Sequence, residues 1–410
     1  MAERDWGSVP YVTDLFRRHY ASRAVEVGAP PAMKQREFGF LSFGGRTMLR
    51  HVAFDDEGQL RRHLAESGPA HVYYSSAYYS APEAGMEWKG WLGADLVFDI
   101  DADHIDTPCK ADHDRWRCSA CGEKGMGTAP ERCPQCGKAA FEEETWFCER
   151  CLQSAKYEAQ KLLDFLIQDF GLSSGELQIN FSGNRGYHVH VRSPRVKCLD
   201  QLARREVVDY IMGTGIKPEY HGYGRTRGGL SALAEEGWRG RSTRALYDYV
   251  GTATPEEAKR LKLGKEATRS LLEDRDEILR TLRERHPSHI LRYIDPKALG
   301  RLMEAAVKEQ ASAIDTVVTT DVHRLIRLPN TLHGKTGWLS QTIDIDDLGD
   351  YDPLLSAIAF NGGTETVYVR RAPRFRIGDE AYGPFEEERA ELPLAAAVFL
   401  LCRKAARVEG

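Results

Sequence analysis

Three aspartates alternate with apolar residues in the segment LVFDIDADH, at positions Asp99, Asp101 and Asp103. Residues two apart in a strand lie on the same face, so a strand here would have one apolar and one acidic face. Crowded carboxylates repel one another unless water or cations neutralise them. The pattern is typical of a half-buried strand with a solvated acidic face. It also fits a site for Mg²⁺, which proteins hold with one or two carboxylates, water and phosphate oxygens.

A second segment, FSGNRGYHVHV, predicts two strands joined by a glycine-containing turn. Its glycines permit a tight turn and a close approach of the backbone to a ligand. Arg185 lies in the turn, with Ser182 just before it and His188 just after it. All three side chains can donate hydrogen bonds to phosphate oxygens. A plain hairpin with a solvated arginine is the alternative interpretation of this segment.

A third segment, AIDTVVTTDVHRLIRLPNTLHGKTG, combines two candidate carboxylates, Asp315 and Asp321, with a group of basic side chains. The possible phosphate ligands are Arg324, Arg327, His333 and Lys335. Taken alone, the segment is also compatible with a strand and turn that have an exposed cationic edge. Taken together, the three segments contain a carboxylate pair, a distant third carboxylate and two sets of basic donors. Two-metal phosphoryl or nucleotidyl transfer requires such a set.

Seven of the nine cysteines fall between residues 109 and 151, in a chain with no apolar signal region at its N-terminus. Metal binding is therefore a better expectation than a disulfide framework. The stretch CSACGEKGMGTAPERCPQCG contains two Cys-x-x-Cys pairs separated by eleven residues, each pair followed by glycine. This spacing predicts a zinc ribbon with four thiolate ligands. The ligands are Cys118, Cys121, Cys133 and Cys136.

The composition describes a soluble globular chain of 410 residues with a net charge of −5, which does not exclude a local basic groove. The apolar run PLAAAVFLLC is too short to span a bilayer and predicts a core helix. We therefore expect an intracellular, cytoplasmic protein with no membrane contact.

The elements that must position these side chains alternate along the chain. Residues 36–100 are mostly strand-like, 199–310 are charged and helical, strand character returns at 314–345, and a helix is expected near 390–407. In the helical part, TPEEAKRLK predicts a capping box beginning at Thr254. The pattern predicts an α/β or α+β fold.

The segments LVFDID, SGNRGYHVHV and DTVVTTDVHRLIRLPNTLHGKTG resemble, in order and spacing, the three motifs of the archaeo-eukaryotic primase family. The similarity is greatest to the archaeal small (catalytic) subunits, and REFGF and CERCLQSAK extend it over roughly residues 30 to 345. By this resemblance Asp99, Asp101 and Asp315 bind the catalytic Mg²⁺ or Mn²⁺ ions, and Asp103 has no role. The implied nucleotide-binding residues are Arg50, Ser182, Arg185, His188, Arg327 and His333. Asn184 stands where some family members have a basic residue.

The resemblance also implies a second zinc site, the family's own zinc knuckle, with the ribbon inserted into it. Its ligands would be Cys109, His113, Cys148 and Cys151, with His104 or an acidic residue as substitutes for His113. The expected fold is a catalytic core of mixed sheets flanked by helices. Its expected parts are the core at 1–105, 153–198 and 311–410 with a C-terminal helix, a zinc-binding module at 106–152 with the ribbon at 117–138, and a helical insertion at 199–310.

The function implied is that of a DNA primase catalytic subunit, which builds short primers from nucleoside triphosphates on a single-stranded DNA template. Its expected partner is the primase large subunit, at replication forks. One alternative is a polymerase of the same family that acts in repair or lesion bypass. Another is a zinc-dependent nucleic-acid-binding protein whose carboxylates are only structural.

Overall fold

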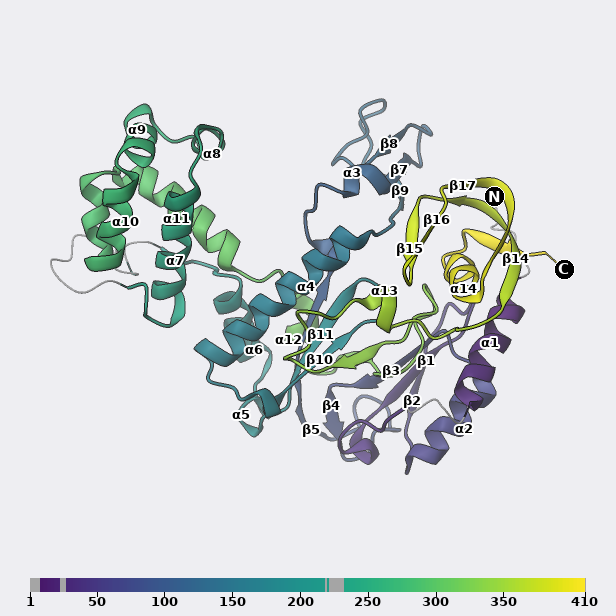
Figure 1. Ribbon diagram of the computed structural model, residues 1–410. Helices are drawn as coiled ribbons and strands as arrows, with labels where there is room; N and C mark the ends of the chain where they lie inside the picture. The colour runs from purple at the N-terminus through teal and green to yellow at the C-terminus, as the bar shows by residue number, and fades with distance from the viewer. Residues whose placement is uncertain (1–7, 23–26, 218–219, 221–231, 410) are drawn as a thin grey trace. The chain divides into compact units, whose positions relative to one another are not determined.

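A computed structural model describes residues 8–22, 27–217, 220 and 232–409. The chain forms two compact units, each made of segments that are separate in sequence (Figure 1). The larger unit comprises Met1–Tyr157, Ser174–Arg204 and Asp315–Gly410, and the helical unit comprises Glu158–Ser173 and Arg205–Ile314. Part of the expected helical insertion, at 218–219 and 221–231, lies outside the described residues.

Two four-stranded antiparallel sheets form the centre of the larger unit. The first sheet has the strand order β12 (Leu325–Arg327), β3 (His71–Ser75), β1 (Phe38–Leu41) and β2 (Leu49–Val52). The second has the order β13 (Gln341–Ile343), β10 (Leu177–Phe181), β11 (Gly186–Val191) and β6 (Leu96–Asp101). The predicted hairpin is confirmed, because β10 and β11 pair directly. Every strand pairing in the described residues is antiparallel, and the prediction of a fold that mixes sheets and helices is confirmed.

Smaller sheets and helices complete the larger unit. The cysteine-rich part forms β7 (Arg115–Cys118), β8 (Lys124–Met126) and β9 (Phe141–Glu144), next to the short helix α3 (Lys110–His113). Near the C-terminus, β14 (Thr364–Ala372), β17 (Phe385–Pro393) and β18 (Ala406–Val408) form one sheet, and β15 (Phe375–Ile377) pairs with β16 (Glu380–Tyr382). The other elements are α1 (Val9–Ala21), α2 (Glu57–Ser67), β4 (Ala77–Tyr79), β5 (Trp91–Ala94), α4 (Glu149–Asp164), α5 (Pro194–Lys197), α12 (Thr316–Thr320) and α13 (Pro353–Ser356).

The apolar run near the C-terminus forms α14 (Leu394–Cys402), as a core helix. Residues Ala396 to Cys402 are all buried. Figure 1 shows the strands β14 and β17 curving around this helix. A helix that is apolar on every side must be covered on every side, and this sheet provides part of the cover.

The helix α2 lies between the strand-like stretches of residues 36–100, and α12 lies in the segment 314–345, where the pattern predicted strand character. The helix α2 begins because the Asp56 side chain accepts a hydrogen bond from the Gln59 amide, and it ends at Gly68, where φ is +54°. The helix α12 begins in the same way at Asp315, whose carboxylate accepts hydrogen bonds from the amides of Val317 and Val318. In α12 the aspartate N-cap overrides the strand-like run of β-branched residues that follows it.

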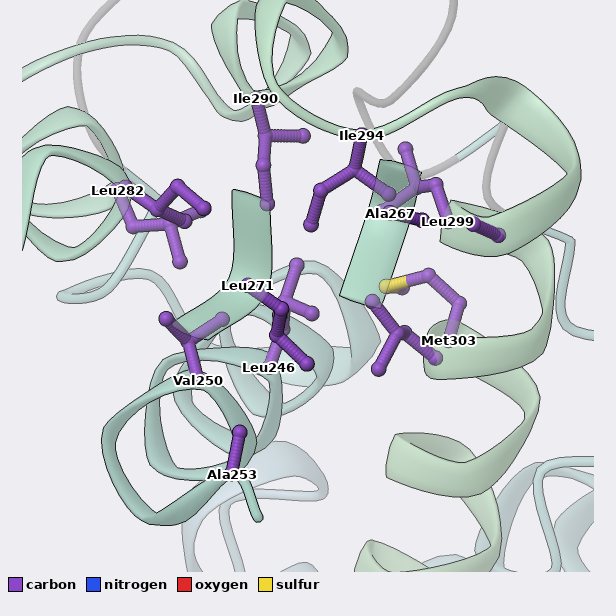
Figure 2. Close-up of a cluster of buried hydrophobic side chains, with 13 residues drawn as sticks. Leu246, Val250, Ala253, Ala267, Leu271, Leu282, Ile290, Ile294, Leu299 and Met303 are labelled. Atoms are coloured by element: carbon purple, nitrogen blue, oxygen red, sulfur yellow. The ribbon is translucent and has the colours of Figure 1, made fainter. Parts of the chain in front are cut away.

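The helical unit packs around a core of aliphatic side chains. Its principal helices are α6 (Gln201–Ile211, which begins in the larger unit), α7 (Gly237–Thr252), α8 (Pro255–Arg260), α9 (Lys265–Glu273), α10 (Arg275–Glu284) and α11 (Pro296–Gln310). Figure 2 shows Leu246, Leu271 and Met303 directed toward one another in this core. The predicted capping box at Thr254 is confirmed at the start of α8. No helix in the described parts of the chain is long and apolar enough to cross a membrane.

Replacing Leu282 by alanine is expected to destabilise the helical unit by about 2–5 kcal/mol, because the leucine is fully buried and its removal leaves a cavity. The measurement is denaturant-induced unfolding followed by circular dichroism. Leu202→Ala is the control, since Leu202 is 76% exposed. Equal unfolding midpoints for the two variants would contradict the packing described here.

Candidate active site

The pairing of β6 with β11 sets the geometry of the first two aspartates. Asp99 lies opposite His188, and Asp101 lies opposite Gly186. The His188 Nε2 atom is 3.5 Å from Asp99 Oδ1. A side chain at Gly186 would not fit, because its Cβ would lie 2.1 Å from the Ile100 carbonyl oxygen. The glycine therefore allows the turn to approach the acidic end of β6.

The third aspartate reaches the same place through a backbone contact. The Asp315 amide donates a 2.8 Å hydrogen bond to the Asp99 carbonyl, although the two residues are more than two hundred positions apart. Asp321 lies at the other end of α12 and accepts a hydrogen bond from the His323 amide. Burial, with the nearby carboxylates of Asp101 and Asp315, raises the pKa of Asp99 to about 7. Asp315, rather than Asp321, is thus the electrostatic neighbour of Asp99.

The three aspartates are near one another but do not converge tightly. Among the described residues, only two groups bring three or more His, Cys, Asp or Glu ligand atoms within 4.8 Å of one another, and both are cysteine-containing. The neighbouring carboxylates repel one another, which contributes to the raised pKa of Asp99. A divalent cation would relieve that repulsion, and carboxylate oxygens are the ligands that Mg²⁺ and Mn²⁺ prefer. The donor set therefore fits such ions.

Arg185 and Asp103 form an ion pair that the sequence did not predict. Arg185 Nε donates to Asp101 Oδ1 at 3.0 Å, and a second guanidinium nitrogen pairs with Asp103. Asp103 lies in a 3₁₀ turn, Ala102–His104, after the strand has ended. Asp103, for which the sequence predicted no role, is partly exposed just past the end of the strand and pairs with Arg185. It holds Arg185 beside Asp101.

The turn before β11 is shaped by its own side chains. Ser182 Oγ accepts hydrogen bonds from the amides of Asn184 and Gly186, at 3.3 and 3.2 Å. Gly183 has φ of +81°, and a Cβ there would lie 2.9 Å from His333 Cβ. The turn and the His333 segment are thus in direct contact, which brings the second and third sequence motifs together.

A group of basic side chains from several segments lies near the aspartates, with Lys335 close enough to Asp101 for an electrostatic interaction. Burial and the cations Arg185 and Arg403 lower the pKa of Lys335. Burial and the charge of Arg327 lower the pKa of His333 well below its usual value. The His333 ring packs edge-on against His71, with 4.8 Å between ring centroids. His71 and Arg403 were missed in the sequence, because neither lies in a segment with a recognisable motif.

Arg50 contacts a carboxylate outside this group of residues. Its guanidinium pairs at 3.0 Å with Glu37, a buried carboxylate that also pairs with Lys89 at 2.9 Å. The Arg50 side chain is 38% exposed, so one side of the guanidinium still faces solvent. Its predicted contact with phosphate remains a prediction.

Both predicted cysteine sets come together. In the ribbon, the Sγ atoms of Cys118 and Cys136 are 3.6 Å apart, as are those of Cys121 and Cys133. Four thiolates bound to one tetrahedral zinc ion lie about 3.8 Å from one another, given a bond length of about 2.3 Å. The ribbon therefore has the size that a zinc ion requires.

The outer set has the same dimensions. Cys109 and Cys151 have their Sγ atoms 3.5 Å apart, and His113 Nε2 is 3.3 Å from Cys151 Sγ. Cys148 is the fourth member. The Asp114 carboxylate contacts the other ring nitrogen of His113 at 2.8 Å, which is the usual way to orient a histidine ligand. His113, rather than His104, belongs to the set of converging ligand atoms.

Comparison with known proteins agrees with this geometry. A family model described as DNA primase small subunit matches residues 129–345. The chain belongs to the DNA primase small subunit family. It is 31% identical over 395 residues to the DNA primase small subunit PriS of Cenarchaeum symbiosum, with 96% of both chains covered. It is 34% identical to the protein of the same name from Methanothrix thermoacetophila, with 97% of this chain and 98% of that one covered. The family match begins within the ribbon, just before Cys133, and extends through the second motif and all of the third.

The two cysteine sets predict two zinc ions per chain, since each set has four soft or borderline donors at zinc distances. Cys118→Ser and Cys109→Ser are each expected to lower the zinc content from two to one. The measurement is metal analysis of the purified protein. Cys198→Ser is the control, because Cys198 is exposed and outside both sets, and should leave two zinc ions. A wild-type protein with one zinc ion or none would contradict the assignment.

Proposed function

We propose that this chain is the catalytic subunit of a DNA primase, which copies a single-stranded DNA template by joining nucleoside triphosphates into a short primer. The observation that carries the proposal is the 2.8 Å contact between the Asp315 amide and the Asp99 carbonyl. It brings the third motif to the acidic end of β6, beside a group of buried cations. Carboxylates next to unneutralised cations are the arrangement that a metal-bound triphosphate requires.

Asp99, Asp101 and Asp315 are the residues that would hold two divalent cations. When bound, Mg²⁺ or Mn²⁺ would activate the attacking 3′-hydroxyl and neutralise charge on the triphosphate as pyrophosphate leaves. His188 is kept neutral beside Asp99, since burial and the charge of Arg327 lower its pKa to about 3. A neutral imidazole adds no positive charge that would compete with cations for the carboxylates.

The basic side chains would orient the incoming triphosphate. Arg327 and His333 come from the third motif, and Ser182, Arg185 and His188 come from the β10–β11 turn and β11. Guanidinium groups bind phosphate oxygens through two parallel hydrogen bonds, which fixes direction as well as distance. Lys335 adds a point charge at the same group of residues.

The proposed partners are the primase large subunit and single-stranded DNA. Synthesis on an unprimed template separates a primase from a repair or bypass polymerase of the same family, because only the primase joins the first two nucleotides. The assay with ribonucleotides and with deoxyribonucleotides establishes which set the site accepts. A protein that extends primers but never starts them would be assigned to the polymerase alternative.

Asp101→Ala is expected to lower primer synthesis by about a hundredfold or more, because it removes one of the carboxylates that would hold the catalytic cations. Synthesis on an unprimed single-stranded template is the measurement, with zinc content and melting temperature checked in parallel. Asp321→Asn is the matched control, since Asp321 caps a turn near His323 and lies outside the proposed metal site. Substantial activity in Asp101→Ala would refute the assignment.

A further inference from the structure

Three side chains share one face of the first sheet. In the pairing of β12 with β3, Arg327 lies directly opposite Tyr73. His71 is two residues before Tyr73 on the same strand, so its side chain lies on the same face. The register of two strands therefore places His71 and Tyr73 beside the guanidinium of Arg327.

The guanidinium is bound on one side only. Arg327 Nη2 lies 3.0 Å from His71 Nδ1 and donates to the Tyr73 hydroxyl at 3.3 Å. Arg327 Nη1 is buried and has no hydrogen-bond partner. None of the ion pairs found within the described residues involves Arg327, although the residue is only 6% exposed. Its nearest bonded partners are thus neutral groups.

A buried guanidinium without a carboxylate is costly, because the charge has lost its water and gained no opposite charge. His71 must accept the hydrogen bond through an unprotonated Nδ1, since both Arg327 nitrogens carry only donors. Burial and the charges of Arg327 and Lys335 lower the pKa of His71 to about 2, so the ring stays neutral. Two neutral acceptors can fix the direction of the guanidinium without cancelling its charge.

We infer that His71 and Tyr73 are positioning residues, which orient Arg327 and leave its Nη1 and its full charge for the triphosphate of the incoming nucleotide. This inference rests on the proposed function. Neither residue needs to touch the nucleotide, because both act through Arg327. The free Nη1 and the absence of a bonded carboxylate on Arg327 are both explained by a phosphate ligand that completes the site.

Substitutions at position 71 separate orientation from charge. His71→Asn keeps a neutral acceptor near the position of Nδ1, and His71→Asp puts a negative charge in nearly the same place. His71→Leu removes the acceptor. If Arg327 needs a neutral acceptor at this position, the KM of His71→Asn for nucleoside triphosphate is expected to stay within about threefold of the wild-type value. His71→Leu is expected to raise this KM by about tenfold. His71→Asp is expected to raise KM more than His71→Leu does, because its carboxylate competes with phosphate for Arg327.

The experiment measures KM and kcat for nucleoside triphosphate on a single-stranded template, together with template affinity, zinc content and melting temperature. Tyr73→Phe provides a second variant that keeps the ring and loses the hydroxyl, with a smaller expected rise in KM. In an Arg327→Leu background, His71→Leu is expected to change KM no further, because a positioning residue has nothing left to position. A merely structural role for His71 would lower stability equally with and without Arg327.

Two results would overturn the inference. If the wild-type protein makes primers and the folded His71→Leu and Tyr73→Phe variants have an unchanged KM, the positioning role is refuted. The proposed function is then unaffected. Equal KM values for His71→Asn and His71→Asp would also refute the positioning role, because they would show that charge at this position is irrelevant. A wild-type protein that makes no primers would overturn the proposed function as well.

Discussion

Six residue pairs join β6 to β11, and the geometry of the candidate active site depends on this pairing. The register puts His188 opposite Asp99 and the small Gly186 opposite Asp101. A shift of one residue would turn the aspartates to the other face of the sheet. The Asp99 carbonyl of the same strand also accepts a hydrogen bond from the Asp315 amide. The backbone hydrogen bonds of β6 therefore position the first and second motifs and hold the third beside them.

The candidate active site contains a group of carboxylates and a group of basic side chains, and the charges within each group are only partly paired. Asp99 has a raised pKa because it is buried among other carboxylates, while the pKa values of Arg327 and Lys335 are lowered by burial. Arg185 and Asp103 pair with each other at the border between the two groups. Buried charges without partners lower the stability of the fold. Ionisable groups with shifted pKa values typically cluster at functional sites. A divalent cation bound to a triphosphate would supply opposite charges to both groups, the cation to the carboxylates and the phosphates to the basic side chains.

The sequence predicted those features that depend on local pattern. Alternation identified β6, the glycine turn identified the hairpin, and Cys-x-x-Cys spacing identified both the ribbon and, with the family resemblance, the outer set around His113. It did not predict α12, because a single aspartate N-cap decided the local structure against the run of β-branched residues. The fold places Asp103 on Arg185 and His71 on Arg327 through tertiary contacts between distant segments. No spacing within one segment encodes such contacts.

The central claim is that the aspartates and the buried cations together bind a metal-bound triphosphate. Anomalous diffraction from crystals grown with Mn²⁺ and a non-hydrolysable nucleoside triphosphate tests this most directly. We expect anomalous peaks among the carboxylates of Asp99, Asp101 and Asp315, with the triphosphate in contact with Arg327 Nη1. Peaks elsewhere, or a triphosphate that does not contact Arg327, would contradict it.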